Sequence, residues 1–158
     1  MKDILESTIQ TESAVKTPTE IGRANELVLS HPFHRFAGLK LVTQSPGKAA
    51  TRFQVAGDLL NMNEALQPGV LYGLMDATSF LALITVLKPS EYAATHDIHV
   101  SVLRPVPKGY EVELRAEVIR RSANIAFIRC EAWRISGSDS RLAATAVVTK
   151  SLSFSRDV

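Results

Sequence analysis

The chain has 158 residues, of which 46% are hydrophobic and 22% are charged, and its formal charge at neutral pH is +2. This length and composition are typical of one soluble globular domain with a single core, and they exclude disordered and fibrous proteins. The charge is small, and the chain lacks the dominant patch of Lys and Arg that a DNA-binding domain usually carries. We therefore predict no nucleic-acid partner.

The cysteine content and the first residues of the chain both favour the cytoplasm. The single cysteine, Cys130, excludes an internal disulfide and a cysteine-based zinc cluster, which fits a reducing compartment. The acidic Asp3 and Glu6 stand where a signal peptide needs a basic start and a continuous apolar run. We therefore predict a cytoplasmic protein.

The first half of the chain predicts a short helix and a hairpin. Thr19 is a suitable N-cap for an amphipathic helix that ends near Ser30. Two strands follow, at about Leu39 to Thr43 and Ala49 to Val55, and the turn residues Ser45 to Gly47 join them.

A long apolar segment begins after Gly69 and is stopped by Pro89. It does not alternate and is too long for a strand, so we predict a helix that is apolar on most faces and surrounded by protein. Val70 to Leu87 is long enough to cross a membrane, but the charged Asp76 near its middle argues against a membrane span. We predict no membrane association.

The remainder of the chain is rich in β-branched residues and predicts four strands. The strand sequences are "THDIHVSVLRPV", "YEVELRAEVIRRS", "NIAFIRCEAWRI" and "RLAATAVVTKSLSF". In "YEVELRAEVI" apolar residues alternate with charged ones, so this strand has one buried face and one face in water.

Two strands, one long helix and four more strands lack the strand–helix alternation that a parallel sheet requires. We therefore predict an α+β fold in which a curved antiparallel sheet wraps around one central helix. A polar N-terminal arm is predicted at residues 1–18, and a single domain at residues 19–158.

One pattern of residues carries a family resemblance. Asn61 is followed by the loop "LQPG" at Leu66 to Gly69 and by Asp76, two turns into the apolar helix. Together with the strand "THDIHVSVLRPVPKG", this pattern resembles the hotdog-fold thioesterases, and within them the PaaI-like acyl-CoA thioesterases of the phenylacetate pathway. The resemblance extends from about residue 31 to residue 154 and implies the hotdog fold.

The resemblance also implies a catalytic site. In such enzymes the helix carboxylate, here Asp76, acts as general base for water or as nucleophile, and backbone N–H groups at the helix start, here Gly69, hold the oxyanion. Asn61 would orient the attacking water and Thr95 would steady it. The residues themselves agree, because a carboxylate among apolar side chains loses hydration and favours a proton-accepting role. A helix N-terminus likewise offers free N–H donors.

The loop departs from the family's usual His-Gly-Gly at two positions. Gln67 can donate a hydrogen bond but is neither acid nor base, and Pro68 has no N–H to offer an oxyanion. The Gly69 N–H and the Gln67 amide remain as donors. Two functions stay open: a thioesterase for a fatty or aromatic acyl-CoA, and a non-catalytic acyl-CoA or acyl-ligand binding protein. A Gly69 N–H already bonded within the protein would favour binding, and a dehydratase is disfavoured because Gln67 replaces the expected His.

Substrate contacts are predicted at two places. Arg120, Arg121 and Ser122 lie beside a turn, in the region where the family contacts the nucleotide part of CoA, and Arg suits phosphate binding. Two solvated arginines at a strand end are the alternative. Tyr72 and Phe80 on the helix would line an acyl tunnel or belong to the core.

No metal and no cofactor are expected, and coenzyme A enters only as part of the substrate. His96 and His99 lack a helical His-Glu pattern, and their spacing places them on opposite faces of a strand. The resemblance implies a homodimer or homotetramer with its sites at the dimer interface. There Asp76 of one chain would face Asn61 or Thr95 of the other.

Overall fold

The structure, a computed structural model, describes residues 15–154, so most of the predicted N-terminal arm lies outside the described residues. The helices are α1 (Pro18–Ser30), α2 (Pro32–Phe36) and α3 (Pro68–Leu83), with 3-10 turns η1 (Gly57–Leu59) and η2 (Ile84–Val86). The strands are β1 (Lys40–Ser45), β2 (Lys48–Gln54), β3 (Tyr92–Val102), β4 (Glu111–Arg121), β5 (Ile125–Ser136) and β6 (Asp139–Ser153).

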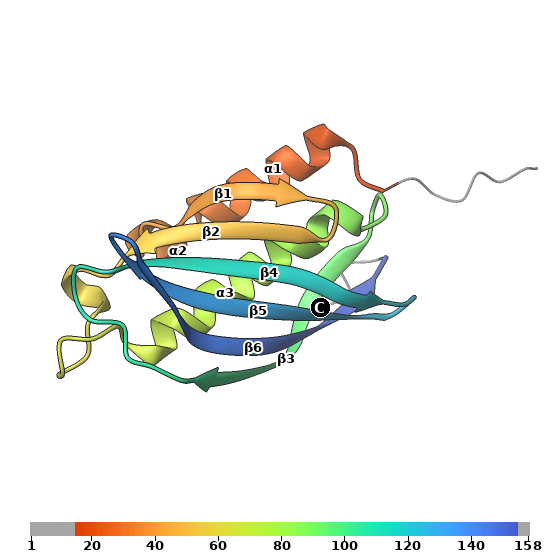
Figure 1. Ribbon diagram of the computed structural model, residues 1–158. Coiled ribbons are helices and arrows are strands. Elements are labelled where there is room, and N and C mark those ends of the chain that lie inside the picture. Colours follow the sequence, from red (N-terminus) through yellow and green to blue (C-terminus); the bar gives the residue numbers. More distant parts are fainter. Residues whose placement is uncertain (1–14, 155–158) are drawn as a thin grey trace, which may run out of the picture.

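The six strands form one antiparallel sheet in the order β1-β2-β4-β5-β6-β3, with β1 and β3 at its edges. Figure 1 shows the sheet curving past α3, which lies along one of its faces. The predicted curved antiparallel sheet around one long helix is therefore confirmed.

Helix α3 supplies the centre of the core. Leu74, Met75 and Leu81 are fully buried, and they share the core with Leu114 of β4 and Ile128 of β5. The segment from α3 through η2 is long and apolar enough to cross a membrane, but 61% of it is buried inside the molecule. The core helix of a soluble protein is likewise long, apolar and mostly buried. The burial of α3 therefore agrees with the prediction of a helix packed inside protein.

Helix α1 starts earlier than the sequence predicted. Its N-cap is Thr17 rather than Thr19, because Thr17 and Glu20 form a reciprocal capping box and Pro18 occupies the first helical position. The Thr17 N–H donates to the Glu20 carboxylate at 2.8 Å, and these hydrogen bonds lower the pKa of Glu20. Thr19 lies inside the first turn of α1 and is not its N-cap. The division between an arm at residues 1–18 and a domain at residues 19–158 stays a prediction.

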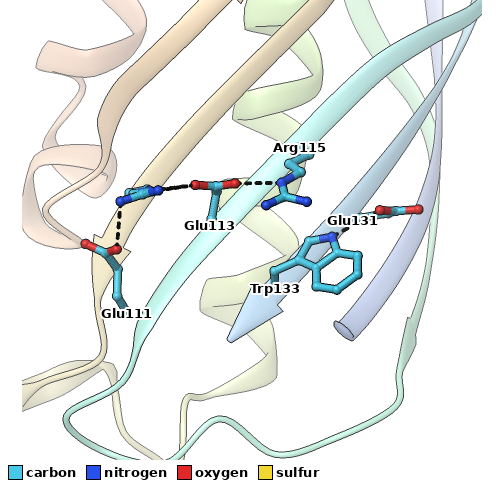
Figure 2. Close-up of polar contacts among 6 residues, drawn as sticks. Glu111, Glu113, Arg115, Glu131 and Trp133 are labelled. Carbon is cyan, nitrogen blue, oxygen red and sulfur yellow. Dashed lines mark hydrogen bonds and ion pairs between the residues drawn. The ribbon is translucent and has the colours of Figure 1, made fainter. Parts of the chain in front are cut away.

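The outer face of the sheet is less exposed to solvent than the sequence predicted. Glu113 of β4 belongs to the charged side of the alternating pattern, yet only 7% of it is exposed. The reason is a pair of hydrogen bonds, because Arg52 and Arg115 each donate from Nε to the Glu113 carboxylate at 2.6 Å. Figure 2 shows Arg115 beside Glu113. Burial alone would raise the pKa of Glu113, but these two guanidinium groups hold it below its usual value.

Candidate functional site

Three side chains from three elements meet on the helix-facing side of the sheet. Asp76 of α3 accepts a hydrogen bond at Oδ1 from Lys150 Nζ of β6 at 2.7 Å. Thr95 Oγ1 of β3 lies 2.8 Å from Asp76 Oδ1 and 3.0 Å from Oδ2. Lys150 Nζ also donates to Thr95 Oγ1 at 2.7 Å, which closes the cluster. We call Asp76, Thr95 and Lys150 the acid cluster.

The sheet register brings Thr95 and Lys150 together, although 55 positions separate them in sequence. Strands β3 and β6 pair antiparallel, and Thr95 stands directly opposite Lys150. The register shifts between Thr95 and Asp97, which marks a β-bulge beside the cluster, and such bulges re-aim neighbouring side chains. Thr95 therefore contacts Asp76 of its own chain, which corrects the expectation that it would reach Asp76 across a dimer interface.

Lys150 was not predicted as a site residue. Its side chain is only 3% exposed, and Nζ lies 5.9 Å from the ring centre of Phe80. Burial lowers the pKa of Lys150, and the Asp76 carboxylate opposes that shift. The sequence held one signal: in "RLAATAVVTKSLSF" the alternation puts Lys150 on the same side as the buried Val148 and Leu152.

Asp76 is more accessible than its base, with 33% of its side chain exposed. Sequence reasoning placed it among apolar side chains, but its nearest partners are an ammonium and a hydroxyl group. The Asp76 carboxylate is thus held by hydrogen bonds and is still accessible to solvent. A catalytic group needs both properties, because it must be oriented and must contact the substrate.

Asp76 belongs to a partly uncovered stripe on α3. Gly69, Tyr72, Asp76 and Phe80 follow one another at intervals of three or four residues, so they share one side of the helix. None of the four is buried, whereas nine other residues of α3 are. We call these four residues the open stripe. Tyr72 and Phe80, predicted to contact substrate, thus flank Asp76 on the same helix side.

Gly73, beside the open stripe, is held against α2. A methyl group at this position would lie 2.7 Å from Cε1 of Phe33, which is closer than side-chain atoms tolerate. The Phe33 ring therefore packs directly on the helix backbone and covers one flank of the stripe, one turn before Asp76.

The start of α3 leaves one backbone donor free. The Gln67 side chain forms no capping hydrogen bond, and Pro68 occupies the first helical position. Within residues 15–154 the N–H of Gly69 has no acceptor, and Gly69 is exposed. The observation that would have favoured a purely binding function, a Gly69 N–H already bonded, is thus not met.

Asn61 shapes the loop that leads to α3. Its Oδ1 accepts hydrogen bonds from the N–H groups of Asn63 at 2.9 Å and Ala65 at 3.3 Å. The side-chain oxygen is thereby used in a local turn, as is common for Asn. The structure does not bring Asn61 to the acid cluster of its own chain.

The arginines predicted to bind CoA phosphates differ in their surroundings. Arg121 donates from Nη2 to Glu91 Oε1 at 2.6 Å and also contacts Oε2. Glu91 is 1% exposed, so Arg121 holds a buried carboxylate and has a structural role that the sequence did not predict. Arg120 is exposed. Ser122 donates to the carbonyl of Ile125 at 3.1 Å and closes the β4–β5 turn.

The outer face of the sheet holds a hollow of about 410 Å³ over β1, β2, β4 and β5. It lies on the opposite side of the sheet from Asp76, and charged side chains that pair with one another line it, among them Glu113, Arg115 and Glu131. In Figure 2 the Trp133 indole donates to Glu131 beside Arg115. Because these carboxylates are occupied by cations or the indole, we place the candidate active site at the acid cluster and not in the hollow.

Metal-binding groups are the other kind of site to consider. Among the residues that the structure describes, no group of three or more His, Cys, Asp or Glu side chains is arranged to hold a metal ion. The absence of a metal and of a cofactor stays a prediction.

Comparisons with known proteins agree with the motif. Residues 66–140, which run from the loop before α3 into β6, match the family model of the thioesterase superfamily. A mutant form of the phenylacetic acid degradation protein PaaI from Thermus thermophilus is 28% identical, with a TM-score of 0.68 over 77% of this chain and 98% of that chain.

Two more distant structures share the fold. A thioesterase family protein from Silicibacter pomeroyi is 18% identical, with a TM-score of 0.77 over 84% of this chain and 97% of that one. A thioesterase from Haemophilus influenzae is 20% identical, with a TM-score of 0.77 over 92% of this chain and 98% of that one. No curated protein sequence matches this chain. The shared fold identifies the chain as a hotdog-fold protein, and the match of residues 66–140 together with the Asn61–Asp76 pattern makes it similar to the PaaI-like members of the thioesterase superfamily.

Proposed function

We propose that this protein is an acyl-CoA thioesterase that hydrolyses its substrate with a water activated by Asp76. The observation that carries the proposal is the acid cluster itself: an accessible carboxylate, hydrogen-bonded by Thr95 and Lys150, on the open stripe of the central helix. The match to the thioesterase superfamily supports the same reaction class.

In the proposed reaction Asp76 accepts a proton from water while the water oxygen attacks the thioester carbonyl carbon. The carbonyl oxygen becomes negative and is stabilised by the N–H of Gly69 at the positive end of α3. The C–S bond then breaks, the sulfur takes up the proton held by Asp76, and a carboxylic acid and CoA thiol are released. Direct attack by Asp76 on the carbonyl carbon is the alternative first step.

The geometry favours a site built by two copies of the chain. Gly69 and Asp76 are seven residues apart on one helix, which corresponds to roughly 10 Å along its axis. One thioester carbonyl cannot contact both groups across that distance. Strand β3, which carries Thr95, lies at one edge of the sheet formed by the described residues, and an edge strand can pair with a strand of another chain. We infer a homodimer joined at β3, in which Gly69 and Asn61 of one copy approach Asp76 of the other. A homotetramer remains compatible with it.

The substrate groups are assigned by exposure and charge. The exposed Arg120 is the proposed contact for CoA phosphates, because Arg121 is paired with Glu91. Tyr72 and Phe80 on the open stripe are the proposed contacts for a fatty or aromatic acyl chain. The reaction needs no cofactor, and a cytoplasmic location remains our prediction.

One observation favours a second function. Pro68 occupies the first position of α3, where it removes the N–H that would lie nearest to Gln67. If the Gly69 N–H alone does not stabilise the oxyanion, the protein binds acyl-CoA or a related acyl ligand without hydrolysing it.

Thiol release from a panel of short, long and aromatic acyl-CoAs tests the proposal. We expect hydrolysis by the wild type and a fall of at least about a hundredfold in Asp76→Ala and Asp76→Asn, the scale expected when a general base is lost. Asp139→Asn is the matched control, because Asp139 pairs with Arg141 at the exposed β5–β6 turn. Acyl-CoA binding without hydrolysis by the wild type would establish the second function instead.

A further inference from the structure

We propose that Lys150 is a positioning residue that anchors Asp76 through Oδ1 and through Thr95, so that Oδ2 is the carboxylate oxygen that reacts. The inference deepens the proposed function and rests on it. It assigns a role to a buried cation on β6 that lies outside the Asn61–Asp76 pattern.

The direction of each hydrogen bond follows from the donors available. A lysine ammonium has three protons and no acceptor, so in the 2.7 Å contact with Thr95 the hydroxyl oxygen must accept. The Thr95 hydroxyl proton is then left to donate, and the Asp76 carboxylate lies at 2.8 and 3.0 Å from it. Lys150 therefore orders Thr95, and both groups donate toward Asp76.

The two carboxylate oxygens of Asp76 are not equivalent. Oδ1 receives the Lys150 ammonium at 2.7 Å and has the shorter contact with Thr95. Oδ2 has only the longer Thr95 contact at 3.0 Å, within the described part of the chain. Because a carboxylate oxygen can accept about two hydrogen bonds, Oδ2 keeps room for a water or a carbonyl carbon.

Burial excludes Lys150 from direct contact with a substrate. Its side chain is 3% exposed, and its ammonium faces Asp76, Thr95 and the ring of Phe80. Lys150 thus acts through Asp76. Since Lys150 and Thr95 lie opposite each other in the β3–β6 ladder, both anchors of the carboxylate stand on one rigid pair of strands.

The first test is Lys150→Met, which keeps the length of the side chain and removes the ammonium. We expect kcat for thioester hydrolysis to fall on the order of 10- to 100-fold, the cost of a misplaced catalytic group, with KM unchanged within about twofold. Lys48→Met is the matched control, because Lys48 pairs with Glu117 at 3.2 Å on the outer face of the sheet. Its kcat should equal that of the wild type.

A double-mutant cycle separates positioning from a general structural effect. If Lys150 acts only through Asp76, the Asp76→Asn/Lys150→Met protein hydrolyses no more slowly than Asp76→Asn alone. Thr95→Val should show the same lack of additivity, while Thr95→Ser, which keeps the hydroxyl group, should retain most of the wild-type kcat. The Thr95 variants also test the cluster if Lys150→Met does not fold.

The outcomes distinguish the two proposals. Wild-type kcat in both Lys150→Met and Thr95→Val, beside an inactive Asp76→Asn, would overturn the positioning role and leave the proposed function intact. Additive losses in the double mutant would also overturn it. A wild type that hydrolyses no acyl-CoA would overturn the proposed function and the positioning role together.

Discussion

Two ion pairs of this molecule, Arg121 with Glu91 and Lys150 with Asp76, bury opposite partners. In the first pair the acid is 1% exposed and the base 22%; in the second the base is 3% exposed and the acid 33%. Glu91 also accepts from the N–H of Lys88 at 2.9 Å, so both of its oxygens are used inside the protein. In Asp76, by contrast, Oδ2 has only the 3.0 Å contact with the Thr95 hydroxyl group within the described residues.

The difference shows how a fold can treat a carboxylate as structure or present it for chemistry. A buried acid with every acceptor occupied ties two segments together and offers nothing to a ligand. A buried base behind an exposed acid fixes the acid's orientation while solvent still reaches it. Glu113 on the outer face follows the pattern of Glu91, because two arginines occupy its oxygens.

The largest stability effect is expected from breaking the Arg121 pair. Arg121→Met leaves Glu91 buried without its cation, which should cost about 3–5 kcal/mol of unfolding free energy. Lys150→Met leaves the Asp76 carboxylate in contact with solvent, so this substitution should lower the unfolding free energy by less than about 1 kcal/mol. Urea unfolding of both variants measures the contrast. Equal losses would mean that exposure of the acid does not distinguish the two pairs, and Glu91→Gln/Arg121→Met should recover part of the loss.

The helix that presents Asp76 is tested through its contact with Phe33. Gly73→Ala forces a methyl group against the Phe33 ring, and the overpacking should destabilise the protein by about 1–3 kcal/mol. Phe33→Leu in the Gly73→Ala background should relieve part of that loss. Thermal unfolding of the wild type and of these two variants gives the comparison. Full stability of Gly73→Ala would show that α2 can move away from α3 without cost.

The two pairs should also differ in their response to alkali. Burial lowers the pKa of Lys150 in the native protein below the ordinary lysine value of 10.5, which applies to the unfolded chain. At a pH between the native pKa and 10.5, the unfolded chain therefore binds more protons than the native one. Stability contributed by this group therefore rises with pH through that window, whereas Arg121 stays protonated throughout. Unfolding free energies of wild type minus Lys150→Met, measured from about pH 8 to the ordinary lysine value of 10.5, should increase.

That subtraction removes a competing effect. Burial raises the pKa of the Cys130 thiol to about 12, which lowers stability at alkaline pH, but the wild type and Lys150→Met carry it equally. A difference that is flat or falls with pH would contradict the burial of a charged Lys150.

The smallest stability change is expected at Arg120, the exposed neighbour of Arg121. Arg120→Ala should alter the unfolding free energy by no more than about 0.5 kcal/mol. It should raise KM for acyl-CoA but not for an acyl thioester that lacks the nucleotide. An unchanged KM for both substrates would remove Arg120 from the substrate site and leave the contrast with Arg121 purely structural.

The sequence predicted the elements well where hydrophobic patterns are strong. The alternation in β4 placed Val112, Leu114 and Ala116 on the buried side, where the structure has them. Asp76 was visible because a single charge interrupts an apolar helix. These signals are local, since each depends only on residues a few positions apart.

The partners of Asp76 were less accessible to sequence reasoning. Finding Lys150 requires the register of β3 on β6, and the bulge beside Thr95 shifts that register by one residue. Recognising that Arg121 holds Glu91 likewise requires the packing of segments 30 residues apart. Long-range pairing of this kind leaves no periodic trace in the chain, so the sequence offered substrate binding or a solvated position for Arg121 and not its pairing with Glu91.

The contact between Phe33 and Gly73 also constrains how related sequences can diverge. A glycine that admits an aromatic ring leaves no room for a side chain of its own, so the two positions share one fixed volume. In homologous chains, a larger residue at position 73 should therefore accompany a smaller residue at position 33. The pair is expected to covary, although a whole hairpin separates the two residues along the chain.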